Sequence, residues 1–208
     1  SFYRLPTYEQ FRTWSQQTAS HPGFCFAVKA SRYITHLKKL REAGEGLERL
    51  ISSAKGLGDK LGPFLYQLPP HWHANTARLE EFIAKLPHEY AAAFEFRDPT
   101  WFEPQQISAL QRILGNADCA LVVAIGGSSP TPLDVPRIGP FGYLRFHSGV
   151  HGIGLSDEEL DFWAKRLLAE VSQGHTIYVY FNNDPEGYAI RDAMRLREMV
   201  GEAAVLPR

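Results

Sequence analysis

The side chains best suited to chemistry lie near the ends of short apolar runs. Glu95 and Arg97 alternate with two phenylalanines, and Arg145 alternates with aromatic and aliphatic residues ahead of His147. Because successive side chains of a β-strand point to opposite faces, the two polar residues of each run share one face. A carboxylate or an imidazole there can transfer protons, and a guanidinium can bind phosphate or carboxylate. We therefore predict Glu95 and His147 as catalytic residues and Arg97 and Arg145 as ligand-binding residues.

Three further runs carry polar residues in the matching position. Lys29 ends one run, Gln67 lies in a second, and Tyr180 and Asn182 alternate with aromatic residues in a third. The cations of these five runs outnumber their one carboxylate, Glu95, and an excess of buried cations requires an anionic partner. The sequence therefore predicts that these residues bind a small ligand that carries phosphate or carboxylate. The alternative is a closed salt-bridge network that only stabilises the fold.

Other candidates for ligand binding lie outside these runs. Arg32 and His36 belong to a basic segment, residues 29–41, that is suited to phosphate contact. Trp101 either covers the site and stacks on the ligand or packs against the next helix. Tyr3 and Arg4 complete the set, because the segment around them resembles the end of a further strand.

The elements that position these residues form a repeating pattern. Short apolar runs alternate with longer amphipathic segments, which is typical of β/α units around a parallel sheet. The inner face of a β/α barrel gathers polar side chains at the C-terminal strand ends, where barrel enzymes build their sites. The sequence thus predicts an α/β fold of the TIM-barrel type. The predicted strands are Phe24–Lys29, Phe64–Leu68, Ala92–Arg97, Ala120–Ile125, Gly142–His147 and Thr176–Asn182.

Helix signals support the same pattern. Ser156 and Glu159 form a predicted capping box before a helix that ends at Gly174. Pro104 is expected at the first turn of a helix over Gln105–Leu114.

The chain length bounds the number of domains and of strands. With 208 residues and a net charge of −1, we expect one domain over residues 1–208. A complete TIM barrel has about 250 residues, and six strands with a strand end near Tyr3 do not make eight. We therefore expect a barrel that lacks the first strand–helix unit and most of its second strand, with residues missing upstream of Ser1.

Composition narrows the class of protein. No apolar run approaches the roughly 20 residues of a membrane span, and no signal peptide is visible. Cys25 and Cys119 both lie in apolar runs, so we expect buried free thiols rather than a disulfide. Free thiols are typical of a reducing cytoplasm, which is the expected location.

Several chemistries remain open for the predicted site. The first is an enzyme, a hydrolase or lyase acting on an anionic substrate, with a Schiff base at Lys29 as one variant. The second is a nucleic-acid-binding protein or a phosphodiesterase or nuclease, and the third is a non-catalytic ligand-binding protein. We predict no cofactor, because the His, Asp and Glu residues near the strand ends are too few for a multinuclear centre. A single divalent metal is the one alternative.

The sequence also resembles the DUF72 family, whose members are called YecE-like proteins. The resemblance implies a TIM-like barrel with an N-terminal strand and helix ahead of Phe2, and it implies no settled activity. Family members often carry an acid near the end of the run that here reads Val123-Ala124-Ile125-Gly126. The matching segments, in family order, are Ser1–Pro6, Phe26–His36, Gln67–Pro70, Phe94–Phe102, Gly142–His147 and Tyr178–Asp184.

Overall fold

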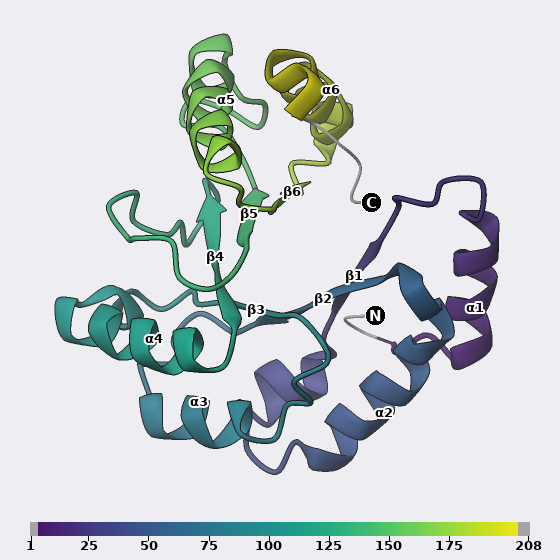
Figure 1. The fold of residues 1–208 in the computed structure, drawn as a ribbon. Helices are drawn as coiled ribbons and strands as arrows, with labels where there is room; N and C mark the ends of the chain where they lie inside the picture. The colour runs from purple at the N-terminus through teal and green to yellow at the C-terminus, as the bar shows by residue number, and fades with distance from the viewer. Residues whose placement is uncertain (1–3, 204–208) are drawn as a thin grey trace.

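Six parallel strands form one curled sheet in the computed structural model, which describes residues 4–203 (Figure 1). The strands follow chain order across the sheet, and every neighbouring pair is parallel. Consecutive parallel strands need crossover connections, which the helices provide. The strands are β1 (Phe26–Lys29), β2 (Leu61–Gln67), β3 (Ala92–Glu95), β4 (Cys119–Ile125), β5 (Gly142–Phe146) and β6 (Ile177–Phe181).

Helices cover the outer face of this sheet. Ser156 and Glu159 form the predicted capping box of α5, and Pro104 stands in the first turn of α4, so both predicted helix starts are confirmed. The α-helices are α1 (Tyr8–Gln17), α2 (Gly44–Ala54), α3 (Thr76–Ile83), α4 (Pro104–Asn116), α5 (Asp157–Ser172) and α6 (Tyr188–Val200). Shorter helical turns are η1 (Tyr33–Leu37), η2 (Lys55–Lys60), η3 (Pro99–Phe102), η4 (Pro185–Gly187) and η5 (Gly201–Ala203).

The apolar side chains separate into an inner cluster and two outer clusters. One outer cluster packs β1–β4 against α1–α4, and the second packs the later strands against α5 and α6. Figure 1 shows the two groups of helices on different sides of β4. The inner cluster contains Leu65, Ala93, Val122, Tyr143 and their neighbours, which alternate along each strand with the outward residues. The inner face is therefore a packed core below the strand ends.

Strand β4 joins the two halves of the sheet by a stagger. Its first half, Cys119–Leu121, pairs with β3, whereas its second half, Val122–Ile125, pairs with β5. Such a shift of register along the barrel axis accompanies the tilt of strands in a closing sheet. As a result the end of β5 lies further along the barrel than the end of β3.

The structure confirms the six predicted strands, with bounds that differ by at most a few residues. It shows a curled, half-barrel parallel sheet with helices outside. The predicted strand end at Tyr3 lies outside the described residues, and Arg4–Thr7 has no regular structure. Cys25 is half-buried and Cys119 buried, and both are free thiols. Among residues 4–203, no helix has the length and apolar character to cross a membrane.

Candidate functional site

Glu95 occupies the centre of a charged cluster at the strand ends. It is the last residue of β3, lies in register with Gln67 of β2, and has no solvent exposure. Arg97 Nε donates a hydrogen bond to Glu95 Oε1 at 2.7 Å, and Arg145 Nη1 donates to Glu95 Oε2. Arg145 Nη1 also donates to Gln67 Oε1 at 3.4 Å. Three strands thus bring four predicted site residues into one network.

The two guanidinium groups decide the charge of Glu95. Burial alone would raise its pKa, but the charges and hydrogen bonds of Arg145 and Arg97 outweigh burial and lower the pKa. Glu95 is therefore a carboxylate at neutral pH. This charge compensates for burying Arg145, which is almost fully enclosed.

Small side chains on β4 make the contact between β3 and β5 possible. Ala120, Val122 and Ala124 are the inward residues of β4, and all three are buried. Ala124 pairs with Arg145 in the register of β4 and β5. Because an alanine fills little of the space above the inner core, Arg145 reaches over β4 to Glu95. The inner residues of β4 include no acid.

Lys29 brings a third cation to the cluster from β1. It ends that strand on the inner face and is half-buried. Burial and the positive charges of Arg145 and Arg97 lower its pKa to about 8, against a smaller opposing effect of Glu95. Lys29 therefore stays mostly protonated at pH 7, with a minor neutral fraction.

His147 lies directly after β5 on the same inner face. Its Nε2 is 4.0 Å from Glu95 Oε1, is buried, and has no hydrogen-bond partner in the described part of the chain. Burial lowers the pKa of His147 to about 4. The charge of Glu95 opposes this shift, whereas the positive charges of Arg145, Arg97 and Lys29 add to it. His147 is thus a neutral imidazole at pH 7.

Two glycines of the loop after β4 pack behind His147. Gly126 and Gly127 have φ angles of 68° and 71°, which glycine adopts without strain. A Cβ at Gly126 would lie 2.2 Å from the carbonyl oxygen of Ser148, and one at Gly127 would lie 3.0 Å from Cβ of His147. Gly127 also donates its backbone N–H to Ser148 Oγ. Because these two glycines have no side chains, the segment that carries His147 can pack closely against them.

The basic segment at residues 29–41 divides between the cluster and the surface. His36 belongs to the short turn η1, and burial with the charges of Lys29, Arg32 and Arg97 lowers its pKa to about 4. These charges place Arg32 and His36 near the cluster, although Arg32 is exposed. Lys38 pairs with Glu42 at 3.0 Å. Turns with positive φ at Lys39, Leu40 and Glu42 follow η1, so the basic segment does not form one continuous helix.

The β6 residues line the other side of the inner face. Tyr180 stacks on Tyr143 with ring centroids 4.9 Å apart. Burial raises the pKa of Tyr180, so both rings stay neutral. Asn182 follows β6 and is exposed at the edge of the sheet. Tyr143 was missed from sequence, although the strand alternation puts it on the face of Arg145.

Trp101, Asn183, Arg4 and Tyr3 lie away from the network around Glu95 or outside the described residues. Trp101 is fully buried outside the sheet, stacks on Phe96 at 4.2 Å, and donates its indole N–H to a backbone carbonyl. The structure therefore does not bring Trp101 to the cluster. Asn183, which directly follows Asn182, is buried and donates to Asp192. Arg4 is exposed, and Tyr3 lies outside the described residues.

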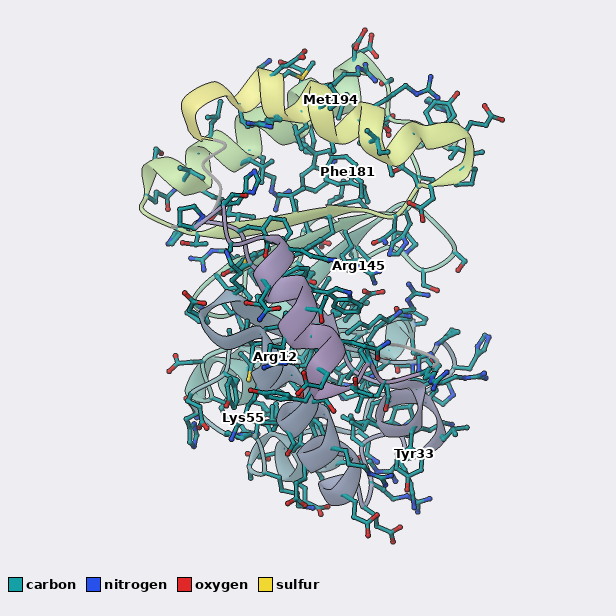
Figure 2. The ribbon with its side chains drawn as sticks, turned by 90° about the vertical axis from the view of Figure 1, so that its right-hand side faces the viewer. Arg12, Tyr33, Lys55, Arg145, Phe181 and Met194 are labelled. Carbon is teal, nitrogen blue, oxygen red and sulfur yellow. The ribbon has the colours of Figure 1, made fainter. Side chains whose placement is uncertain are left out.

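The arrangement favours anion contact over metal coordination. Residues 4–203 contain no group of three or more His, Cys, Asp or Glu side chains placed to hold a metal ion. Arg145 hydrogen-bonds to described residues only through Nη1, and Arg97 only through Nε. The remaining guanidinium donors point the chemistry toward oxygen-rich anions. Figure 2 shows the molecule from the side that lies between β1 and β6. In this view Arg145 lies below Phe181 and Met194 and above Arg12 and Lys55.

These features define a protein class: a β/α half-barrel with a cation-rich cluster at its strand ends. The chain belongs to the DUF72 family, described as "Protein of unknown function DUF72", which it matches over residues 1–208.

Solved structures show the same fold. A DUF72 family protein from Enterococcus faecalis superposes with a TM-score of 0.82 at 18% identity, over 96% of this chain and 82% of that chain. One from Thermotoga maritima gives 0.77 at 24% identity, over the same shares. None of the curated proteins matches the chain. At these identities the likeness supports the architecture alone.

Proposed function

We propose that the strand-end cluster binds a small anionic ligand that carries phosphate or carboxylate. The observation that carries this proposal is the convergence of Lys29, Arg97 and Arg145 on one carboxylate, Glu95. Among the described side chains, that carboxylate forms ion pairs with both Arg97 and Arg145, so it balances one of these two guanidinium charges. A bound anion would supply the missing negative charge and accept hydrogen bonds from the unused guanidinium donors.

Within this proposal, enzymatic action on the ligand gives Glu95 and His147 different roles. Glu95 stays charged and orients two guanidinium groups, so it is better suited to positioning than to proton transfer. His147 presents a buried, unpaired Nε2 toward the same group. A bound anion would raise the pKa of His147 and make it a better base, which suits a hydrolase or lyase.

Thermal unfolding in the presence of anions tests ligand binding. We expect inorganic phosphate or sulfate, at constant ionic strength against chloride, to raise the Tm of the protein. An anion at a hundred times its Kd adds about 2.7 kcal/mol to the free energy of unfolding. Arg145→Ala removes the central guanidinium and should abolish the rise.

Two further variants separate site loss from instability. Arg97→Gln removes a guanidinium that is 24% exposed from the same cluster and should weaken the anion effect while the protein remains folded. Arg112→Gln removes the same charge from an exposed ion pair with Glu80 and should leave the effect unchanged. The proposal fails if phosphate and sulfate leave the wild-type Tm at its chloride value, or if all variants respond like the wild type.

A further inference from the structure

The connection between β4 and β5 covers the outer face of the sheet without a helix. Residues 126–141, all of which the structure describes, form turns and loops, whereas each of the other strand connections carries an α-helix. Figure 1 shows this β4–β5 segment as a long loop beside β4. Val135 and Ile138 of the segment are buried in the outer core, and Ile138 accepts a backbone hydrogen bond from Leu121 of β4. Contacts that hold the segment therefore decide how well this part of the sheet is covered.

Arg137 ties the β4–β5 segment to the C-terminal end of α5. Its Nε donates to Glu170 Oε2 at 3.0 Å, and its Nη2 lies 2.9 Å from His175 Nε2. His175 Nδ1 lies 2.9 Å from the same Glu170 oxygen. Glu170 belongs to the last turn of α5, and His175 lies in the turn that leads into β6. These three side chains, the Arg137 triad, thus join the segment, α5 and the start of β6.

The hydrogen bonds of the Arg137 triad fix the protonation state of His175. A guanidinium has only donors, so His175 Nε2 accepts from Arg137 and carries no proton. An ionised carboxylate has only acceptors, so His175 Nδ1 carries the ring proton and donates it to Glu170. The intact triad therefore requires the neutral Nδ1–H tautomer. A second ring proton on Nε2 would point at the N–H groups of Arg137, and two cations would then share one carboxylate oxygen.

We propose that the Arg137 triad is a pH switch, in which protonation of His175 breaks its contact with Arg137 and loosens the β4–β5 segment. Histidine is the side chain that ordinarily changes charge between pH 5 and pH 8. Glu170 holds the protonated ring on α5, so the contact that is lost is the one to the segment. Arg166 lines the hollow beneath the segment together with Arg137 and Glu170, and it adds a further positive charge there.

Loosening the segment would uncover this hollow. The hollow has a volume of about 50 Å³ and is lined mainly by apolar side chains of β4, β5 and α5, with Val123, Leu144 and Trp163 among them. Its opening would expose the outer face of the sheet between α4 and α5. The proposed anion site lies on the inner face, so this inference does not depend on the proposed function.

Amide hydrogen exchange of the full chain at pH 7.5 and pH 5.5, corrected for intrinsic exchange rates, tests the switch. The reporters are the N–H groups of Leu121 and Val135, which donate to carbonyls of the β4–β5 segment. We expect their protection to fall about fivefold at pH 5.5, the effect of losing a partly exposed polar contact. The N–H of Phe64, in the other half of the sheet, should keep its protection. His147 and His36, with pKa values of about 4, stay largely neutral at both pH values and do not produce this change.

The matched variant is His175→Gln, because its amide can accept from Arg137 and donate to Glu170 without titrating. It should keep the high protection of both reporters at both pH values, whereas Arg137→Gln should show low protection at both. His151→Gln removes an exposed loop histidine and should respond like the wild type. Unchanged protection of the reporters at pH 5.5 in the wild type, or an equal loss in His175→Gln, would overturn the switch. Nitrogen NMR of the His175 ring at pH 7.5 is an independent check, since a proton on Nε2 would also overturn it.

Discussion

Glu95 holds two guanidinium groups in place, so its charge affects both stability and ligand affinity. Glu95→Gln keeps the shape of the side chain but leaves Arg145 buried without its carboxylate. Breaking a buried ion pair in this way should lower the free energy of unfolding by about 3 kcal/mol, measured by urea denaturation. The same change leaves more positive charge in the cluster, so the Kd for phosphate should fall.

The matched control for this change is Glu80→Gln. Glu80 pairs with Arg112 on the exposed surfaces of α3 and α4, and such pairs contribute less than about 1 kcal/mol. Equal losses of stability in the two variants would contradict the central position of Glu95. An unchanged or higher phosphate Kd in Glu95→Gln would contradict the charge argument.

The pKa of His147 predicts how stability depends on pH. Its folded-state pKa is about 4 against an ordinary value of 6.5, so the unfolded chain binds the proton more tightly. The contribution is therefore present above pH 6.5 and is lost as the pH falls toward 4. Allowing for the partial exposure of the ring, this loss amounts to about 2 kcal/mol. Urea denaturation between pH 4 and pH 7.5 measures it.

His147→Gln should remove the part of this pH dependence that His147 contributes, because glutamine does not titrate, whereas the part that His36 contributes remains. His151→Gln changes an exposed loop histidine nearby and should leave the dependence as in the wild type. A pH profile identical in all three proteins would show that His147 is protonated as easily in the folded state as in the unfolded chain.

At the level of elements, a buried network fixes α6 to the loops that surround the strand ends. Asp192 of α6 is fully buried and accepts hydrogen bonds from the backbone N–H of Leu155 and from Asn183 Nδ2. Arg195 donates to the same carboxylate and to the carbonyl of Leu155. Helix α6 is thus held by polar contacts in addition to its apolar face.

Removing this carboxylate tests the anchoring of α6. Asp192→Ala leaves the Leu155 N–H buried without its acceptor and removes one of the two acceptors of the Asn183 amide, the other being the carbonyl of Ile153. This should cost about 3 kcal/mol of unfolding free energy. Asp184→Ala removes an exposed carboxylate just before α6 and should change stability by less than about 0.5 kcal/mol. Circular dichroism during urea denaturation measures both. A loss below 1 kcal/mol in Asp192→Ala would show that apolar packing alone holds α6.

Local signals explain which elements could be predicted from the sequence. Alternation within single strands was enough to place Glu95, Arg145 and Lys29 on one face, because the period of a strand is fixed by its backbone. The capping box of α5 is equally local. The place of Trp101 was left open, because its burial depends on a partner far along the chain, Trp72. The burial of Asn183 depends on Asp192 of α6 and has no local signal.

At the level of the whole molecule, the sequence predicts the order of the β/α units but not the register in which their strands pair. The stagger of β4 between β3 and β5 sets which strand ends come together, and it follows from pairings between distant segments. The reach of Arg145 over Ala124 to Glu95 depends on that stagger. The sequence therefore predicts which residues face inward, whereas their contacts required the assembled sheet.

The division of the outer face into two apolar clusters has a consequence for cooperativity. Lys29 and Glu95 belong to the half built on α1–α4, and Arg145 lies on the strand that packs against α5 and α6. A partial opening that detaches the second half would separate Arg145 from Glu95 and dismantle the ligand contacts. An anion bound across this junction therefore links two units of local unfolding, and we expect its binding energy to slow the hydrogen exchange of β5 and β6 more than that of α2.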